Sequence, residues 1–378
     1  MSDARQGRGE SDAGSPARLN RGWVFVGRSE RDTGSQSRPG PGGGSFANRG
    51  ESGSGSPARG VLQPGRRRPG RGLLARPGVV LVAAGAALWG TDALFRRGLA
   101  LDLPTVEVVF WEHALLAAIA LVLVVPAAGA LRTLSRRDWL ALALIGGGSS
   151  VAATVLFTEA FKHGDPTTPL LLQKLQPVFA AGMAYVLLRE RLRPRYFLFL
   201  AAALGASYLV AFADPGQVTV ERLLPAALGA GAAFLWALGT VLGRHAGIKV
   251  APAQLAGLRF LLGFPVAAIL LVALGDGVQA RPGDVPALVG LALVPGLLAL
   301  LLYYRGLRDT PAATATLAEL AFPATALVVN ALAFGTVPTG SQLLGAALLA
   351  GTVVALGLGE ARGWTGVWID RPRRARWA

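Results

Sequence analysis

The chain has 378 residues, of which 52% are hydrophobic and only 16% are charged, and its formal net charge is +15. This composition is too apolar for an ordinary soluble fold of this length. Cysteine is absent, which excludes disulfides, zinc thiolate centres and thiol catalysis.

The N-terminal segment differs in composition from the rest of the chain. Residues 1–77 contain 14 arginines and no lysine in a background of glycine, serine and proline, which predicts a disordered segment. No cleavable signal sequence is visible, so we expect the first apolar stretch to act as an uncleaved insertion signal. We expect Arg66, Arg67 and Arg68 to bind anionic lipid and to keep this end in the cytoplasm. No motif for a specific nucleic acid accompanies the charge.

Ten mostly uncharged stretches follow, and each is long enough to cross a hydrocarbon core about 30 Å thick. The sequence therefore predicts an all-α integral membrane protein with ten transmembrane helices. The stretches cover residues 78–97, 105–126, 139–160, 167–188, 196–213, 223–243, 252–275, 285–304, 312–334 and 340–359.

The second half of the chain repeats the first about 146 residues later. Pro177 matches Pro323, and Phe157 matches Tyr303. Each copy contains five stretches, an odd number, so the second copy must enter the membrane in the opposite orientation. We therefore predict two inverted five-helix repeats, at residues 78–213 and 223–359.

The distribution of positive charge agrees with inversion. The loop at 189–195 carries four arginines, whereas the matching loop at 335–341 carries none. With the N-terminus inside, the inner loops and the basic, tryptophan-containing segment 360–378 hold 16 lysines and arginines, and the outer loops hold five. The positive-inside rule then places both ends in the cytoplasm. Arg96 and Arg97 are the weak point, because this arrangement leaves them outside.

Two prolines interrupt the fourth and ninth stretches at matching positions. Pro177 and Pro323 each remove the hydrogen bond to the carbonyl four residues earlier, which belongs to Gln173 and to Glu319. A packing kink explains either proline alone. Corresponding interrupted helices in two repeats indicate a binding site near the middle of the membrane.

Five of the ionisable residues within the predicted helices fall into two layers. Helix rise places Lys174, Glu112 and Asp92 in one layer, and Arg259 and Glu319 in a second layer nearer the inner side. Isolated charges are costly in lipid, so we expect Lys174 to pair with Asp92 or Glu112, and Arg259 to pair with Glu319. Lys174 and Glu319, beside the kinks, are the better candidates for contact with a ligand, whereas bracing between helices suits Glu112 and Arg259.

Further candidates surround these layers. His113, next to Glu112, could carry a proton at neutral pH or serve only in packing. Trp89 and Trp236 match across the repeat and are candidate binding residues. The small or polar residues Gly147, Ser150, Thr154 and Thr158 follow at helical spacing on the third stretch. Such a stripe lines a cavity or lets two helices approach closely.

Several short motifs together resemble the EamA-type branch of the drug/metabolite transporter superfamily. The resemblance extends over roughly residues 78–360 and implies ten helices in two inverted repeats that export amino acids, other small metabolites or drugs. In two places the chain departs from the pattern: Thr336 stands where the second repeat usually has the Glu matched here by Glu190, and Glu112-His113 replaces the Arg-Phe of the second copy. The motifs are Trp89-Gly90, Leu258-Arg259-Phe260, Gln176-Pro177-Val178 followed by Arg189-Glu190-Arg191-Leu192, and Gly205.

These observations predict a secondary transporter, with export favoured, for a small polar metabolite, an amino-acid-like compound or a drug. Coupling to protons would use Glu319, Asp92, Glu112 or His113, because no nucleotide-binding loop is present. One alternative is a scaffold or sensor that works through its arginine-rich segment. Another is a membrane enzyme for lipid-linked substrates, with His163-Gly164-Asp165 as an acid/base pair. The sequence predicts no cofactor and no metal site, and a monomer and a homodimer both remain open.

Overall fold

The computed structural model describes residues 78–163, 167–218, 220, 223–275, 277–362 and 367–369. The predicted disorder of residues 1–77, the basic residues 66–68 and most of the segment 360–378 lie outside these ranges. Within the described part of the chain, ten helical spans are long and apolar enough to cross a membrane. The predicted class of fold, ten transmembrane helices in two five-helix repeats, is confirmed.

The first repeat contains five spans, of which three are interrupted or locally unwound. The connecting elements are the short helices η1 (Val125–Ala127), α4 (Ala128–Leu131), η3 (Phe161–His163) and η4 (Pro215–Gln217) and the strand β1 (Glu190–Leu192). The spans are built from α1 (Gly78–Trp89) with α2 (Asp92–Asp102), α3 (Thr105–Val124), α5 (Arg136–Ala143) with η2 (Leu144–Ala152) and α6 (Ala153–Ala160), α7 (Thr167–Gln173) with α8 (Gln176–Leu188), and α9 (Pro194–Ala211).

The second repeat follows the same plan, with two exceptions: its first helix is continuous and its loops differ. The short helix η5 (Pro282–Asp284) precedes α12, and the strand β2 (Val367–Ile369) follows the last span. Strand β2 pairs antiparallel with β1. The spans are built from α10 (Leu223–Ala246), α11 (Pro252–Leu274), α12 (Val285–Leu291) with η6 (Ala292–Leu298) and α13 (Ala299–Leu307), α14 (Ala312–Glu319) with α15 (Ala321–Phe334), and α16 (Gly340–Ala361).

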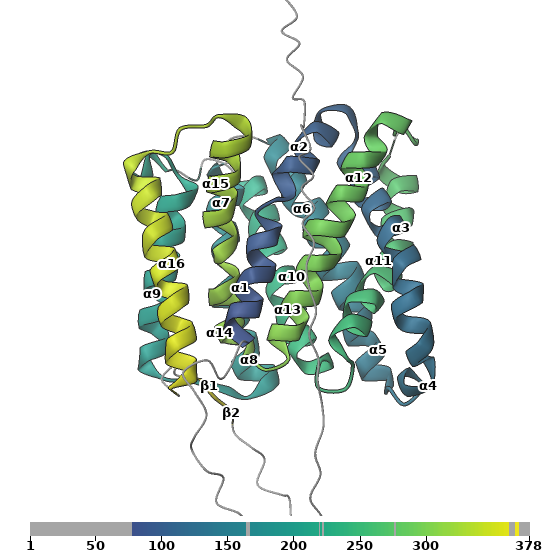
Figure 1. Cartoon of the computed structure of the whole chain (residues 1–378), viewed down its shortest axis with the longest axis horizontal. Helices are drawn as coiled ribbons and strands as arrows, with labels where there is room; N and C mark the ends of the chain where they lie inside the picture. The colour runs from purple at the N-terminus through teal and green to yellow at the C-terminus, as the bar shows by residue number, and fades with distance from the viewer. Residues whose placement is uncertain are drawn as a thin grey trace, which may run out of the picture. The chain divides into compact units, whose positions relative to one another are not determined.

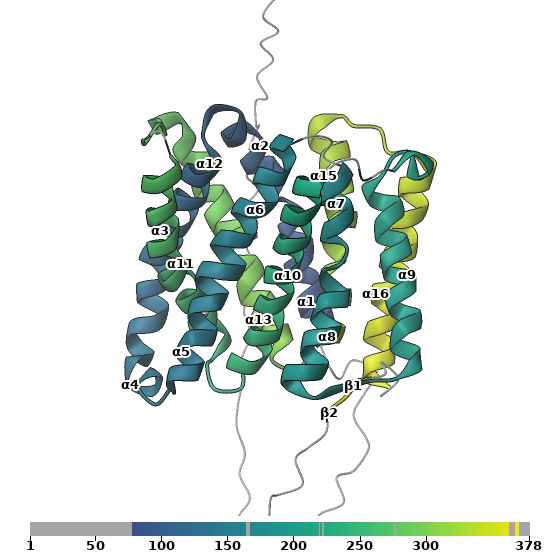
Figure 2. The ribbon, with the colours of Figure 1, turned by 180° about the vertical axis from the view of Figure 1, so that it is seen from behind.

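The two repeats interleave rather than packing as separate bundles. Helix α1 of the first repeat packs against α13, α14 and α15 of the second. Its counterpart α10 packs against α6, η2, α7 and α8 of the first. Helices α3 and α11 pair at one edge, and α9 and α16 pair at the other, with α1 and α10 between them (Figures 1 and 2). Each repeat therefore supplies the central helix that the other repeat encloses.

Small residues allow the central helices to approach closely. A Cβ atom on Gly85 of α1 would lie 2.6 Å from the carbonyl oxygen of Ala299 in α13, so only glycine fits there. In α10, a Cβ on Gly243 would lie 3.0 Å from the ring of Tyr304, and Gly239 lies directly against Ser149 of η2. Close packing without a side chain is typical of membrane helices.

The outer faces of several helices carry large apolar side chains that no other part of the described chain covers. Val272 of α11 is 86% exposed and Leu332 of α15 is 84% exposed. Such exposure would be costly in water over so many residues, whereas lipid tails cover these side chains at no comparable cost. The exposed faces are therefore lipid-facing.

The structure shows two features of the spans that were not predicted from the sequence. The third and eighth spans each contain a π-helical segment, η2 and η6, at corresponding positions of the repeats. The first span does not end at residue 97 as expected. It breaks after Trp89, where Gly90 and Thr91 form a turn, and continues as α2 to Asp102.

The loop after α8 differs chemically from its counterpart after α15, but both loops begin with a residue in the same backbone conformation. Arg189 has a φ of 56° and Gly335 has a φ of 68°, both in the left-handed region at the end of a helix. The next residue, Glu190, is buried and accepts hydrogen bonds from the backbone N–H groups of Ala312 (2.8 Å) and Ala313 (3.1 Å). Burial raises the pKa of the Glu190 carboxyl, while these two N–H groups oppose the shift. Glu190 thus caps the first turn of α14 across the interface between the repeats.

Candidate functional site

A cavity of about 410 Å³ lies between the two repeats. It is lined by residues from eight of the ten spans, and the spans built on α9 and α16 do not contribute. All but one of the predicted site residues line it; the exception, Pro177, is buried but is not part of the lining. Those that line it are Trp89, Asp92, Glu112, His113, Gln173, Lys174, Trp236, Arg259, Glu319 and Pro323. The structure therefore brings together residues that the sequence spreads over more than 230 positions.

Helix breaks border the cavity, as the prolines predict. Helix α7 ends at Gln173, and α8 begins at Gln176 with Pro177 in its first turn. Helix α14 ends at Glu319, and after Leu320 helix α15 begins at Ala321 with Pro323 in its first turn. A third break, at Gly90, has no proline. Helix α15 packs closely against this break: a Cβ on Gly90 would lie 2.7 Å from Cβ of Thr325, so a residue with a side chain does not fit there.

Glu319 lies at one of these breaks and is surrounded by hydrogen-bond donors. Its Oε1 accepts from the hydroxyl groups of Tyr303 (2.8 Å) and Thr240 (3.0 Å), and its Oε2 accepts from Nε2 of Gln176 (2.6 Å). Thr240 Oγ1 also lies 2.8 Å from the Tyr303 hydroxyl and 3.3 Å from the carbonyl oxygen of Trp236. The Thr240 hydroxyl can therefore turn toward Trp236 and leave its oxygen free to accept. The network satisfies both an ionised and a protonated Glu319.

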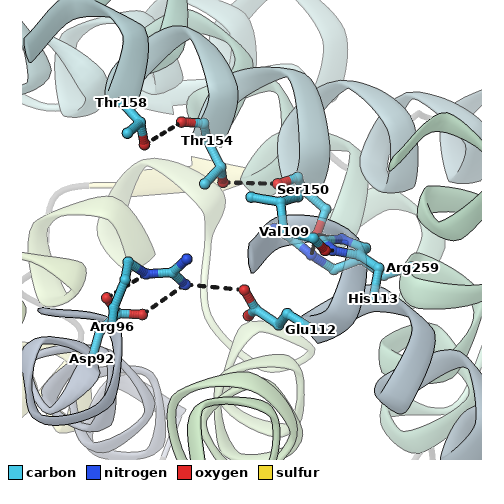
Figure 3. Close-up of polar contacts among 9 residues, drawn as sticks. All are labelled: Asp92, Arg96, Val109, Glu112, His113, Ser150, Thr154, Thr158 and Arg259. Carbon is cyan, nitrogen blue, oxygen red and sulfur yellow. Dashed lines mark hydrogen bonds and ion pairs between the residues drawn. The ribbon is translucent and has the colours of Figure 1, made fainter. Parts of the chain in front are cut away.

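The carboxylates of the first and second spans do not pair with Lys174, so that prediction is wrong. Arg96 of α2 binds both of them (Figure 3). Its Nε lies 2.6 Å from Oδ2 of Asp92, and its Nη2 lies 3.0 Å from Oε2 of Glu112. The reason is that α2 remains helical through Arg96, which places it one turn after Asp92 and beside α3. Arg96 is therefore not a loop charge but the shared partner of two acids.

Arg259 does not form the expected ion pair with Glu319, and that prediction is also wrong. Its Nε donates to Oγ of Ser150 (3.0 Å), and its Nη1 donates to the hydroxyl of Tyr304 (3.3 Å). His113, buried next to this pair, contacts the Val109 carbonyl through Nδ1 (2.8 Å) and Ser150 Oγ through Nε2 (2.9 Å) (Figure 3). Ser150 can accept from Arg259 while it donates to His113, which fits a neutral imidazole with its proton on Nδ1. The chain of bonds fixes Arg259 against the third span.

The ammonium group of Lys174 has no ion pair or hydrogen bond to any other described residue, although Lys174 is only 8% exposed. The neighbouring Gln173 has a buried Oε1 atom that also lacks a partner. Both residues line the cavity at the break between α7 and α8. Buried polar groups are normally paired, so this break contains two groups whose bonding capacity remains free.

Aromatic rings form part of the cavity wall. Trp89 of α1 packs on Tyr303 of α13 with ring centroids 5.1 Å apart. Trp236 of α10 packs on Phe157 of α6 at the same separation. All four residues line the cavity. Tyr303 and Phe157 were not identified as binding residues from the sequence. Their matching positions in the two repeats are the signal that could have identified them.

The polar stripe on the third span lines the cavity more than it packs against a helix. Ser150, Thr154 and Thr158 all contribute to the wall. Gly147 does not, and a Cβ added to it would lie 3.0 Å from Val266 of α11. Thr154 and Thr158 donate to the carbonyls of Ser150 and Thr154, respectively (Figure 3). Their hydroxyl oxygens remain available as acceptors.

Neither a metal site nor an acid/base pair of an enzyme emerges from the described residues. No group of three or more histidine and acidic side chains converges within them. His163 contacts Glu159 at 3.2 Å, and Lys162 binds the same carboxylate. Gly164 and Asp165 of the candidate acid/base pair lie outside the described residues.

The pattern of one sequence family covers both repeats: that of the EamA-like transporter family matches residues 76–212 and 223–358. The chain belongs to this family. One relative is the riboflavin transporter ImpX of Fusobacterium nucleatum, which is 34% identical over 294 residues, 74% of this chain and 97% of the relative. The uncharacterized transporter YwfM of Bacillus subtilis is 28% identical over 200 residues, 52% of this chain and 65% of the relative. A crystal structure aligns with a TM-score of 0.61 at 19% identity, over 76% of this chain and 99% of that chain, a likeness of fold alone.

Membership of the EamA family makes the chain a multi-pass membrane protein of a transporter family. The family match ends before the last described helix does, and it begins only two residues before the first one. Almost all of the arginine-rich N-terminal segment therefore lies outside the part of the chain that matches the family.

Proposed function

We propose that this EamA-family protein is a secondary transporter that exports a small metabolite by alternating access. The observation that carries the proposal is the cavity between two inverted repeats, bordered by one broken helix from each repeat at matching positions. Inverted repeats can exchange conformations, so rocking about a central site opens it to either face in turn. The two helices are already interrupted at these breaks, so the backbone can bend there without breaking further helical hydrogen bonds.

The lining favours a substrate with a planar ring and polar edges. Two aromatic pairs supply flat apolar surface, while Ser150, Thr154 and Thr158 supply hydrogen-bonding groups. Small polar metabolites, amino-acid-like compounds and drugs include many such molecules. Riboflavin is the first compound to test, because the relative ImpX is a riboflavin transporter.

We further propose that Glu319 carries the proton that drives transport. It lies at a helix break, lines the cavity and has no ion pair within the described residues. Its hydrogen-bond network accommodates both protonation states by rotation of the Thr240 hydroxyl. A group that binds and releases a proton without loss of its neighbours' bonds is suited to coupling.

Both ends of the chain are proposed to lie in the cytoplasm. The ion pairs of Arg96 remove the main objection, because this charge lies within the first span and is shared by two acids instead of standing in an outer loop. The cysteine-free sequence allows a direct test with single cysteines at the matching positions Arg191→Cys and Val337→Cys. An impermeant maleimide applied to intact cells should label only the second. Labelling of both from the same side would contradict inversion.

Transport itself is tested with purified protein in liposomes. An imposed pH gradient should drive accumulation of riboflavin or another compound from a panel of small metabolites, measured against protein-free liposomes. A version that lacks residues 1–70 should keep this flux, because the cavity is built from residues 78–334. Loss of all activity on that deletion would favour a scaffold or sensor that works through the N-terminal segment.

A further inference from the structure

We propose that the break between α7 and α8 is an anion-recognition site, in which Nζ of Lys174 binds an acidic group of the transported molecule. Oε1 of Gln173 then accepts a hydrogen bond from an N–H or O–H group beside that acid. The inference rests on the proposed transport function and names the substrate class, a small organic anion with an adjacent hydrogen-bond donor.

The first argument is the distribution of partners among the charges that line the cavity. Asp92 and Glu112 are both bound by Arg96, and Arg259 is held by oxygen atoms of the third and eighth spans. Lys174 alone among these cations has neither an acid nor an oxygen partner within the described residues. Removal of an ammonium group from water is costly unless a counter-charge is supplied. An anionic substrate supplies it.

The second argument is the unsatisfied Oε1 atom of Gln173, one residue away. An amide oxygen accepts hydrogen bonds and therefore cannot bind the anionic group itself. A ligand that also satisfies this oxygen must carry a hydrogen-bond donor beside its acidic group. The pair therefore presents a positive donor next to a neutral acceptor. A carboxylate with a neighbouring amino, ring N–H or hydroxyl group has the complementary pattern.

The third argument is the position of the pair. The helix breaks where Pro177 cannot donate to the Gln173 carbonyl, and Lys174 lies in the turn itself. The corresponding break in the second repeat contains Glu319 instead of a base. The two breaks are thus chemically distinct, one suited to an anion and the other to a proton.

The site can be tested with small aromatic probes that differ in one group each. Isothermal titration of the purified full-length protein would use 2-aminobenzoate, 2-aminobenzamide, which has the same shape without the charge, and benzoate, which lacks the donor. The wild type should bind 2-aminobenzoate at least about tenfold more tightly than 2-aminobenzamide. Lys174→Met should abolish that preference and leave binding of the amide unchanged, while Lys174→Arg should retain part of it. Gln173→Leu should weaken binding of 2-aminobenzoate but not of benzoate.

Stability provides an independent readout. If Lys174 is an unpaired buried cation, Lys174→Met should leave the ligand-free melting temperature unchanged or raise it, whereas loss of a structural contact would lower it. Lys162→Met is the matched control, since Lys162 is exposed and binds Glu159 outside the cavity. Equal affinity of the wild type for acid and amide, no saturable binding of the acid, or an acid preference that survives in Lys174→Met would overturn the proposal. Riboflavin flux that persists alongside such a result would leave the transport function standing and remove only the anion site.

Discussion

The rings of Trp89 and Tyr303 pack 5.1 Å apart across the interface between the two repeats. Their counterparts, Trp236 and Phe157, pack at the same centroid separation with the roles of the repeats exchanged, although the angle between the rings is 64° instead of 48°. Each tryptophan lies on a central helix, and each partner lies on a span with a π-helical segment. The aromatic wall of the cavity is therefore built twice from one ancestral contact. The Tyr303 hydroxyl, absent from Phe157, is the difference that brings the second copy into contact with Glu319.

Removal of either tryptophan should weaken substrate binding more than it weakens the fold. Trp89→Ala and Trp236→Ala each remove a ring that lines the cavity, and we expect a loss of affinity of about tenfold or more, with partial recovery in the corresponding phenylalanine variants. Titration of the purified variants with a transported ligand measures the effect. Trp139→Ala is the control, because that ring is 38% exposed on α5 and does not line the cavity. An equal loss in the control would show that the effect is not specific to the cavity.

Loss of Arg96 alone should lower the stability of the protein more than loss of Arg96 together with both of its acidic partners. Arg96→Gln leaves Asp92 and Glu112 without a counter-charge in a partly buried site, and the cost of breaking such a group is about 3 to 5 kcal/mol. We expect a clear fall in melting temperature. The triple variant Asp92→Asn, Arg96→Gln, Glu112→Gln contains no uncompensated charge and should recover most of the loss. A triple variant no more stable than Arg96→Gln would mean that the positive charge acts on some other group.

Coupling at Glu319 can be separated from binding. Glu319→Gln keeps an oxygen that accepts from Tyr303 or Thr240 but cannot release a proton. Accumulation driven by a pH gradient should disappear, while exchange of labelled for unlabelled substrate across the membrane should continue. Tyr303→Phe, which removes one donor, should shift the pH dependence of transport without abolishing it. Normal accumulation by Glu319→Gln would place the coupling proton elsewhere.

Glu190 should matter for assembly of the repeats rather than for binding. Glu190→Ala leaves two buried N–H groups of α14 without an acceptor, so we expect a loss of about 1 to 3 kcal/mol, whereas Glu190→Gln keeps one acceptor and should lose less. Melting temperature and ligand affinity, measured together, should show a lower stability with unchanged affinity. Glu190 does not line the cavity, so a large change in affinity would contradict this role.

The raised pKa of Glu190 predicts how the stability of the protein changes with pH. Burial raises its pKa in the folded state, so the folded protein binds this proton more tightly than the unfolded chain does. The contribution of Glu190 to stability is complete below the ordinary carboxyl pKa of about 4.3 and is lost as the pH rises through the higher folded-state pKa. Glu190→Gln should flatten the stability profile in that interval. An unchanged profile, followed by thermal unfolding across the acidic range, would assign the titration to another group.

The sequence by itself determined the ten spans, the inverted repeat and two of the three helix breaks. These features have local causes: apolar length decides a span, five helices per copy decide inversion, and Pro177 and Pro323 cannot donate the hydrogen bonds that a helix needs. Only the tertiary structure decided the partners. Arg96 binds both acids because α2 continues past a break at Gly90. At that break α15, more than 230 residues later in the sequence, packs so closely that only glycine fits. Depth along a helix can be counted from the sequence, but the distance between two side chains depends on how the helices pack. This distance decides which charges pair, and it leaves the Lys174 ammonium without a partner among the residues that the structure describes.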